Sequence, residues 1–92
     1  MNRYQVTGTL QERQSLRYTP AGVPALDMQI EHLSTDLNGH DATVNLSGVA
    51  FGLVAQTLVS TPLGSKLKLD GFLRHSAKSK KLIVQIESFE IN

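Results

Sequence analysis

The amino-acid sequence predicts an all-β fold, a five-stranded barrel with one short helix between strands 3 and 4. Apolar and polar residues alternate through most of the chain, which is the two-residue period of half-buried strands. One segment, residues 51–60, has helical spacing instead. The chain has 92 residues and is 40% hydrophobic. That length supports one core rather than two, so we expect a single domain over residues 1–92.

The first strand begins near the N-terminus, and a second strand follows a turn. In the first strand, apolar or small residues recur at every second position: Tyr4, Val6, Gly8 and Leu10. Gly8 in mid-strand predicts a bulge or a close crossing of another strand. Residues 18–24 contain two prolines and a glycine and predict a turn. The second strand then has an apolar face of Leu26, Met28 and Ile30.

The third strand and the helix come next. Residues 34–42 are polar and predict a loop with a turn at Asn38-Gly39. Val44 and Leu46 mark the third strand, which we expect Ser47-Gly48 to bend or end. The helix expected over residues 51–60 carries its apolar face at helical spacing: Phe51, Val54, Ala55 and Leu58. It has no charged residue, so we expect it to plug one end of the barrel, with Pro62 and Gly64 ending it.

The last two strands form a hairpin. The fourth has one apolar face and one polar face, the latter formed by Lys66, Lys68, Asp70, Phe72 and Arg74. The fifth carries Leu82, Val84 and Ile86 on one face and runs nearly to the end. Three strands, a helix and two strands is the order of the OB-fold, a partly open barrel that binds oligonucleotides and oligosaccharides.

Catalytic and metal chemistry is poorly supported. The chain has no cysteine, which excludes disulfides and thiolate metal sites. Its three histidines, His32, His40 and His75, lack the spacing of metal ligands. No nucleophile elbow or phosphate-binding glycine loop is present. We therefore expect no enzyme and no cofactor. With no apolar leader or membrane-spanning run, a soluble cytoplasmic protein is expected.

The positive charge is concentrated in one part of the chain. The formal net charge is only +1, and residues 18–65 contain no lysine or arginine. Residues 66–81, in contrast, contain six basic residues and one acid: Lys66, Lys68, Arg74, Lys78, Lys80 and Lys81 against Asp70. Such a block is the electrostatic footprint of a nucleic-acid site, although lysine-rich turns are also common simply as soluble turns.

The hairpin tip, residues 74–81, is the main candidate for binding nucleic acid. Its members are Arg74, His75, Lys78, Lys80 and Lys81, and Lys66 and Lys68 precede it along the same strand. Lysine is a mobile point charge and arginine can fork onto a phosphate group. Phe72 shares a face with these cations and is the best stacking candidate. It fits an apolar anchor in a subunit interface equally well.

Several motifs resemble a known family. Asn2-Arg3, the segment Arg17-Tyr18-Thr19-Pro20-Ala21-Gly22 and the pair Glu31-His32 resemble the start of bacterial single-stranded-DNA-binding proteins. Within that group the chain most resembles the primosomal replication protein N (PriB) family. This rests on Ile30-Glu31-His32, Asp70-Gly71-Phe72-Leu73 followed by His75, the lysine-bearing loop and the end soon after the fifth strand. The resemblance covers essentially all 92 residues.

The resemblance implies a homodimer of OB-folds that binds single-stranded DNA and assists restart of stalled replication forks. It implies the restart helicase PriA, and in some bacteria DnaT, as partners. Lys78 and Lys81 match basic residues assigned to DNA contact, and Lys80 extends that run. Three positions depart from the family: Val44 replaces a stacking aromatic residue, and Leu33 and Asp41 replace basic residues. We therefore expect more electrostatic DNA binding or more reliance on partner contacts.

Two alternatives stay open beside an accessory DNA-binding protein of the primosome. One is a protein-interaction adapter with weak or no DNA binding, favoured by the absence of tryptophan and by Asp36 and Asp41. The other is an ordinary single-stranded-DNA-binding protein that lacks the usual tail. A measured oligomer mass would help to distinguish this alternative, because it separates a tetramer from a dimer.

The salt dependence of DNA affinity tests whether the hairpin tip contacts phosphates. Four phosphate contacts per subunit predict a log–log salt slope of roughly −3, because each contact on a single strand contributes about −0.7. Both subunits together would double it. Replacing Lys78, Lys80 and Lys81 with alanine should weaken binding to labelled oligo-dT and flatten the slope. Unchanged binding at two salt concentrations would remove these lysines from the site.

Overall fold

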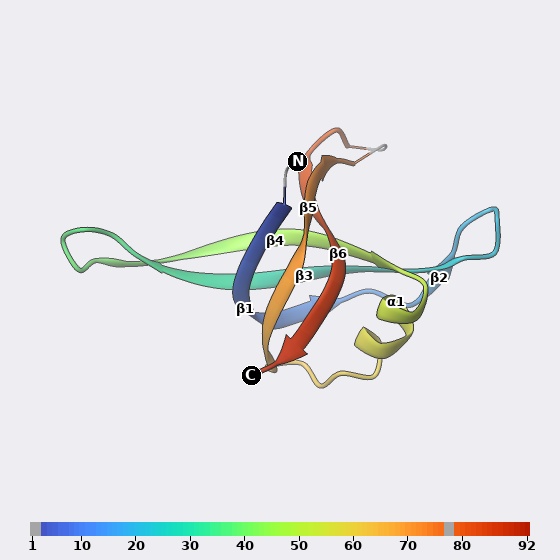
Figure 1. The fold of residues 1–92 in the computed structure, drawn as a ribbon, viewed down its shortest axis with the longest axis horizontal. Coiled ribbons are helices and arrows are strands. Elements are labelled where there is room, and N and C mark those ends of the chain that lie inside the picture. Colours follow the sequence, from blue (N-terminus) through green and yellow to red (C-terminus); the bar gives the residue numbers. More distant parts are fainter. Residues whose placement is uncertain (1–2, 77–78) are drawn as a thin grey trace.

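The structure is a computed structural model that describes residues 3–76 and 79–92. The described elements are β1 (Arg3–Arg13), β2 (Arg17–Tyr18), β3 (Pro24–Thr35), β4 (Asp41–Phe51), α1 (Leu53–Leu58), β5 (Lys66–His75) and β6 (Leu82–Ile91). Figure 1 shows the strands curled around one another, with α1 at one side and a long β3–β4 hairpin projecting from the other.

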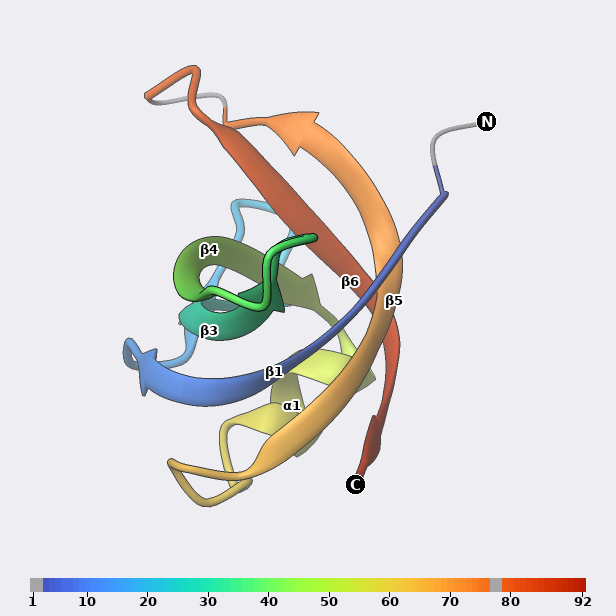
Figure 2. The ribbon, with the colours of Figure 1, turned by 90° about the vertical axis from the view of Figure 1, so that its left-hand side faces the viewer.

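Five strands close into a barrel. The strand order is β1-β5-β6-β4-β3, and an additional pairing of β1 with β3 joins the two ends. All these pairings are antiparallel except β4 with β6, which run parallel through Gly48, Val49 and Ala50. The curvature of β1 and β5 around the barrel is visible in Figure 2. The five predicted strands and their closed arrangement are therefore confirmed, and β2 is a short addition paired with the start of β3.

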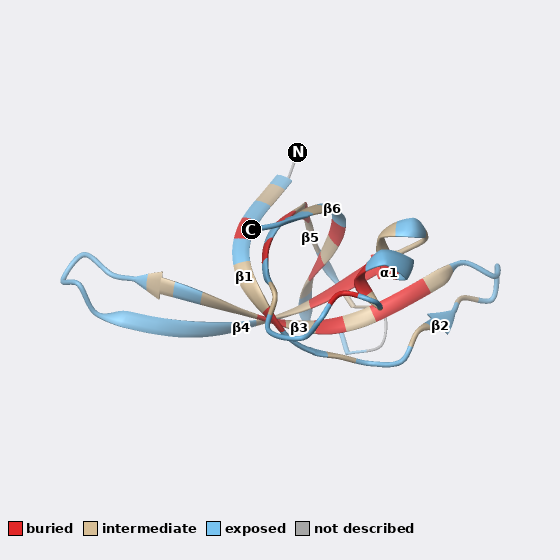
Figure 3. Cartoon of the chain, turned by 90° about the horizontal axis from the view of Figure 1, so that it is seen from below, coloured by how far each residue is buried: buried red, intermediate tan, exposed pale blue. Residues whose placement is uncertain are grey.

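The core fills the barrel and continues under the helix. The largest fully buried side chains come from four strands, β1, β3, β5 and β6, and from α1: Leu10, Leu26, Ile30, Leu58, Leu67, Leu69 and Ile86. In α1, Ala55 and Leu58 are completely buried, so the helix covers one end of the barrel as predicted. Figure 3 shows this buried zone running from the centre of the molecule to α1, while the projecting hairpin stays exposed.

Two boundaries differ from the sequence prediction. β4 does not end at Ser47-Gly48 but continues to Phe51, because Gly48 pairs with Met28 of β3 and Val84 of β6. The helix is also shorter, since it begins at Leu53 rather than at residue 51. Phe51 pairs with Ala25 in the sheet, so the expectation that it belongs to the helix face is wrong.

The polar loop predicted over residues 34–42 is present but shorter than predicted. β3 reaches Thr35 and β4 starts at Asp41, leaving a turn of residues 36–40. At the turn, one Asp36 carboxylate oxygen accepts backbone N–H groups of Asn38 and His40, at 2.8 and 2.9 Å. The hydrogen bond from His40 is the main reason that the pKa of Asp36 lies below its usual value. Hereafter, residues 32–45 are called the β3–β4 arm.

Two glycines allow close approaches between strands. A Cβ on Gly8 would lie 2.4 Å from Ile30 Cγ2 and 2.9 Å from the Glu31 carbonyl oxygen, so the close crossing predicted there is confirmed. The irregularity in the β1–β3 pairing comes later, between Leu10 and Glu12. At Gly71 a Cβ would lie only 2.0 Å from the Gln85 carbonyl oxygen, beside the bulge where β6 slips against β5.

Gly71→Ala should destabilise the barrel by at least about 2 kcal/mol, roughly 10 °C in melting temperature, because the clash is with backbone that both strands hold in place. Gly48→Ala is the matched control. Its Cβ would first meet the end of the Ile86 side chain at 3.3 Å, so a much smaller loss is expected. Equal melting temperatures for the two variants would contradict the claim that the close approach at Gly71 requires a glycine.

Candidate nucleic-acid interface

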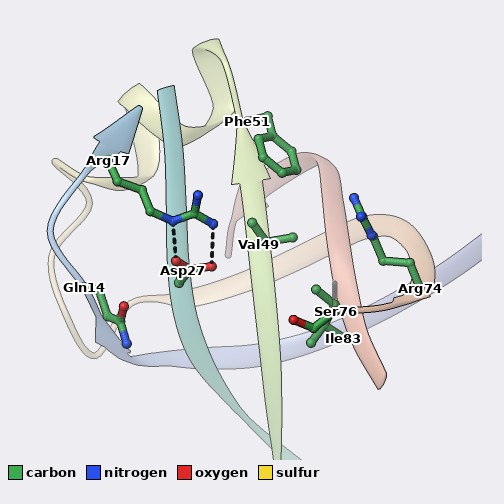
Figure 4. A pocket seen from close by; sticks show the side chains of 8 residues that line it. All are labelled: Gln14, Arg17, Asp27, Val49, Phe51, Arg74, Ser76 and Ile83. Carbon is green, nitrogen blue, oxygen red and sulfur yellow. Dashed lines mark hydrogen bonds and ion pairs between the residues drawn. The ribbon is translucent and has the colours of Figure 1, made fainter. Parts of the chain in front are cut away.

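A groove of about 450 Å³ lies on the outside of the barrel, between the turn that follows β1 and the β5–β6 hairpin. Hereafter called the groove, it is lined by eight residues: Gln14, Arg17, Asp27, Val49, Phe51, Arg74, Ser76 and Ile83. Figure 4 shows β3 and β4 passing along its floor, with Arg17 on one side and Arg74 on the other.

Strand alternation brings the floor residues together. Buried Leu26 and Ala50 face each other in the β3–β4 ladder, so the residues next to them point outward. Asp27 pairs with Val49, and Ala25 pairs with Phe51. β2 adds Arg17 directly opposite Ala25. The groove thus has a sheet floor with an aromatic ring on β4 and a guanidinium group two strands away.

The two arginines of the groove have different partners. Arg17 donates from Nε and Nη2 to the two carboxylate oxygens of Asp27, at 2.8 and 3.2 Å. This hydrogen bonding raises the pKa of Arg17 above its usual value, although burial opposes the shift. Arg74 instead donates from Nη1 to the neutral amide oxygen of Gln85, at 2.8 Å. One end of the groove therefore carries a neutralised ion pair, while the guanidinium at the other end has a neutral partner.

The described part of the hairpin tip extends the cationic end. The Ser76 N–H donates to the Lys81 carbonyl, and the Lys80 N–H donates to the Ser76 carbonyl, at 2.8 and 2.9 Å. Lys80 has a φ of 57°, the left-handed conformation of a tight turn. His75, Lys80 and Lys81 are exposed. Lys78, predicted to contact DNA, lies outside the described residues.

The remaining predicted site residues lie along the outer face of β5. Lys66 and Lys68 are exposed there but do not line the groove. Phe72 is half-buried, pairing with Arg3 of β1 and Gln85 of β6. The structure therefore brings Arg74 to the groove and the described tip residues close to it, and it leaves Lys66, Lys68 and Phe72 farther along the same outer face of β5, outside the groove lining.

Six groove residues lie outside the site predicted from the sequence: Gln14, Arg17, Asp27, Val49, Phe51 and Ile83. Arg17 enters the prediction only through the family motif of residues 17–22, and the spacing of Phe51 indicates the helix. A signal for Phe51 exists in the alternation of Ser47, Val49 and Phe51. It is obscured because Leu46 and Ala50 on the opposite face are apolar too. Asp27 offered no signal, since an outward-facing acid on a strand is ordinary.

Within residues 3–76 and 79–92, no three His, Asp or Glu side chains gather where they could hold a metal ion. Across these same ranges, no helix is long and apolar enough to cross a membrane.

Comparison with known proteins identifies the family. The model of a family described as "another single-strand binding protein family" matches residues 2–88. A Bordetella pertussis protein named replication restart protein PriB is 38% identical over 81 residues, which cover 85% of this chain and 76% of that protein. This chain belongs to the PriB family. The family resemblance predicted from the sequence is thereby confirmed.

Solved structures agree with this assignment. The chain superimposes on PriB from Ralstonia solanacearum with a TM-score of 0.88 and 29% identity, covering 100% of this chain and 98% of that one. A single-stranded DNA binding protein from Thermus aquaticus gives a TM-score of 0.81 at 23% identity, covering 100% of this chain and 50% of that one. The second likeness concerns the fold alone and confirms the predicted OB-fold in this PriB family member.

Proposed function

We propose that this protein binds single-stranded DNA along the groove and the hairpin tip, as an accessory protein of the primosome in replication restart. The observation that carries the proposal is the position of the groove. OB-folds bind oligonucleotides on the face of their second and third strands, between the loop after the first strand and the loop between the last two. Here these are β3 and β4, residues 14–23 and the hairpin tip, and the groove lies among them.

The groove residues fit the two contacts that single-stranded DNA requires. Phe51 is partly exposed on the floor and offers a ring on which a base can stack, a contact that contributes about 1–3 kcal/mol. Arg74, Lys80 and Lys81 lie toward one end and can follow phosphates. Lys78 belongs to the same proposed phosphate-binding set by its sequence position, and Lys66 and Lys68 remain candidates for a flanking contact.

The family supports proposals for the partners and the assembly of this chain. The Bordetella relative is named for replication restart, which supports the restart helicase PriA, and DnaT where present, as partners. A homodimer is supported by β1, which pairs with β5 over residues 3–9 but is hydrogen-bonded to β3 from Thr7 onward, where the His32 ring lies 2.6 Å from the Thr7 carbonyl oxygen. The second edge of residues 3–6 would therefore suit the pairing of another strand. We propose a binding protein rather than an enzyme, working in the cytoplasm.

A second candidate function is an adapter that mainly binds the helicase. The β3–β4 arm favours it, because it contains no lysine or arginine and exposes Leu33 and Leu37. Leu37 is fully exposed at the tip of the arm. Apolar side chains on an acidic ribbon suit a protein surface better than a phosphate backbone.

Phe51→Ala should weaken binding to oligo-dT by about 1–3 kcal/mol, roughly 5- to 150-fold, because it removes the stacking ring from the groove. Phe72→Ala is the matched control, because Phe72 lies on β5 outside the groove lining, and it should change affinity less than about twofold. Fluorescence titration measures both, with melting curves to confirm that each variant is folded. The reverse ranking would move the stacking contact to β5.

Leu37→Ser tests the adapter function. In a pull-down with purified PriA and no DNA, an adapter that uses the arm should lose most of its helicase binding in this variant. Leu63→Ser, at another exposed leucine, is the control. Strong oligo-dT binding together with PriA retention unaffected by Leu37→Ser would reject the adapter.

A further inference from the structure

We infer that the Arg17–Asp27 pair binds the edge of a nucleobase rather than a phosphate group. This rests on the proposed function, because it concerns how single-stranded DNA would lie in the groove. Both residues line the groove, and their side chains are 47% and 37% exposed, so DNA can reach them.

The charge of the pair argues against a phosphate contact. Asp27 accepts two hydrogen bonds from Arg17, so a cation and an anion lie within 3.2 Å of each other. A phosphate brought to Arg17 would also approach the Asp27 carboxylate and be repelled by it. The pair as a whole would release few counterions from DNA, and counterion release is what makes phosphate contacts favourable.

The hydrogen-bonding capacity of the pair suits a base edge. Arg17 uses Nε and Nη2 on Asp27, which leaves further guanidinium N–H donors. Each Asp27 oxygen accepts one bond from Arg17 and has a lone pair to spare. Donors and acceptors therefore stand side by side. Every base presents a donor next to an acceptor on its Watson–Crick edge, whereas a phosphate presents acceptors alone.

The distance from Phe51 also fits a base. Arg17, Ala25 and Phe51 lie in one row across β2, β3 and β4. With strands spaced by about 4.8 Å, the outer two backbones are about 10 Å apart, a distance comparable with the width of a nucleobase. Ala25 in the middle is small and completely covered by its neighbours, so a base would lie above this row of side chains rather than between them. A base stacked on Phe51 would have its edge near the Arg17–Asp27 pair.

The opposite end of the groove completes the assignment. Arg74 is bonded to a neutral amide, and the hairpin tip adds further cations beside it. Phosphates would follow that end while a base enters the neutralised end. Bound DNA would thus lie with a base toward the Arg17–Asp27 pair and its phosphates toward Arg74.

Titration with oligo-dT and with an abasic strand of the same length, at low and moderate salt, tests this assignment. Arg17→Ala and Asp27→Asn should each reduce the preference for oligo-dT over the abasic strand by about tenfold, leaving the salt slope nearly unchanged. Arg17→Lys should behave as Arg17→Ala, because it keeps the charge but loses the fork. Arg74→Ala, the control, should weaken both strands alike and flatten the slope by about 0.7.

Two results would overturn the inference. Equal weakening of both strands by Arg17→Ala, with a slope flattened by about 0.7, would make Arg17 a phosphate contact. An unchanged preference in all three variants, each folded by its melting curve, would leave the pair a structural support of β2. Failure of the unaltered protein to bind oligo-dT would instead reject the proposed function itself.

Discussion

The barrel depends on β1 pairing with two strands at once. Its first half pairs with β5, its second half pairs with β3, and the two pairings meet at Thr9. The turn from one partner to the other requires β1 to pass close to β3, and Gly8 allows this because any side chain there would meet Ile30 and the Glu31 backbone. Without that closure the chain would be an open, twisted sheet with no fixed relation between its two ends.

The candidate interface depends on this closure and on the pairing of β4 with β6. The groove takes Gln14 and Arg17 from the N-terminal part of the chain and Arg74, Ser76 and Ile83 from the C-terminal part. The β1–β3 pairing brings Gln14 beside Asp27, and the β4–β6 pairing places the β5–β6 hairpin beside β4. The charge distribution then divides the surface: Asp27 neutralises one end, the hairpin tip enriches the other in cations, and the β3–β4 arm has no lysine or arginine. Binding is expected to concentrate in the groove rather than to follow the arm.

Much of the fold could be predicted from the sequence, but less of the site. The strands were recognisable because buried and exposed residues alternate over most of their length, although β3 and β4 also bury consecutive residues, at Ala25-Leu26 and Val49-Ala50. The helix start was misplaced because Phe51 continues the apolar spacing of α1, while its backbone is still held by β3 through Ala25. Charge clustering predicts Arg74 and the loop lysines as site residues, and of these Arg74 lines the groove. Arg17, Asp27 and Phe51 were not predicted as site residues. Their common location depends on how β2, β3 and β4 pair, and the residue pattern within one β-strand contains no information on pairing.

NMR mapping of amide and side-chain signals during an oligo-dT titration tests most directly whether single-stranded DNA occupies the groove. The largest shifts are expected at Phe51, at the side-chain N–H groups of Arg17 and Arg74, and at Lys80 and Lys81. The arm around Leu37 should remain nearly unchanged. Shifts confined to Lys66, Lys68 and Phe72 on the outer face of β5, with the groove signals unmoved, would contradict this placement of the DNA.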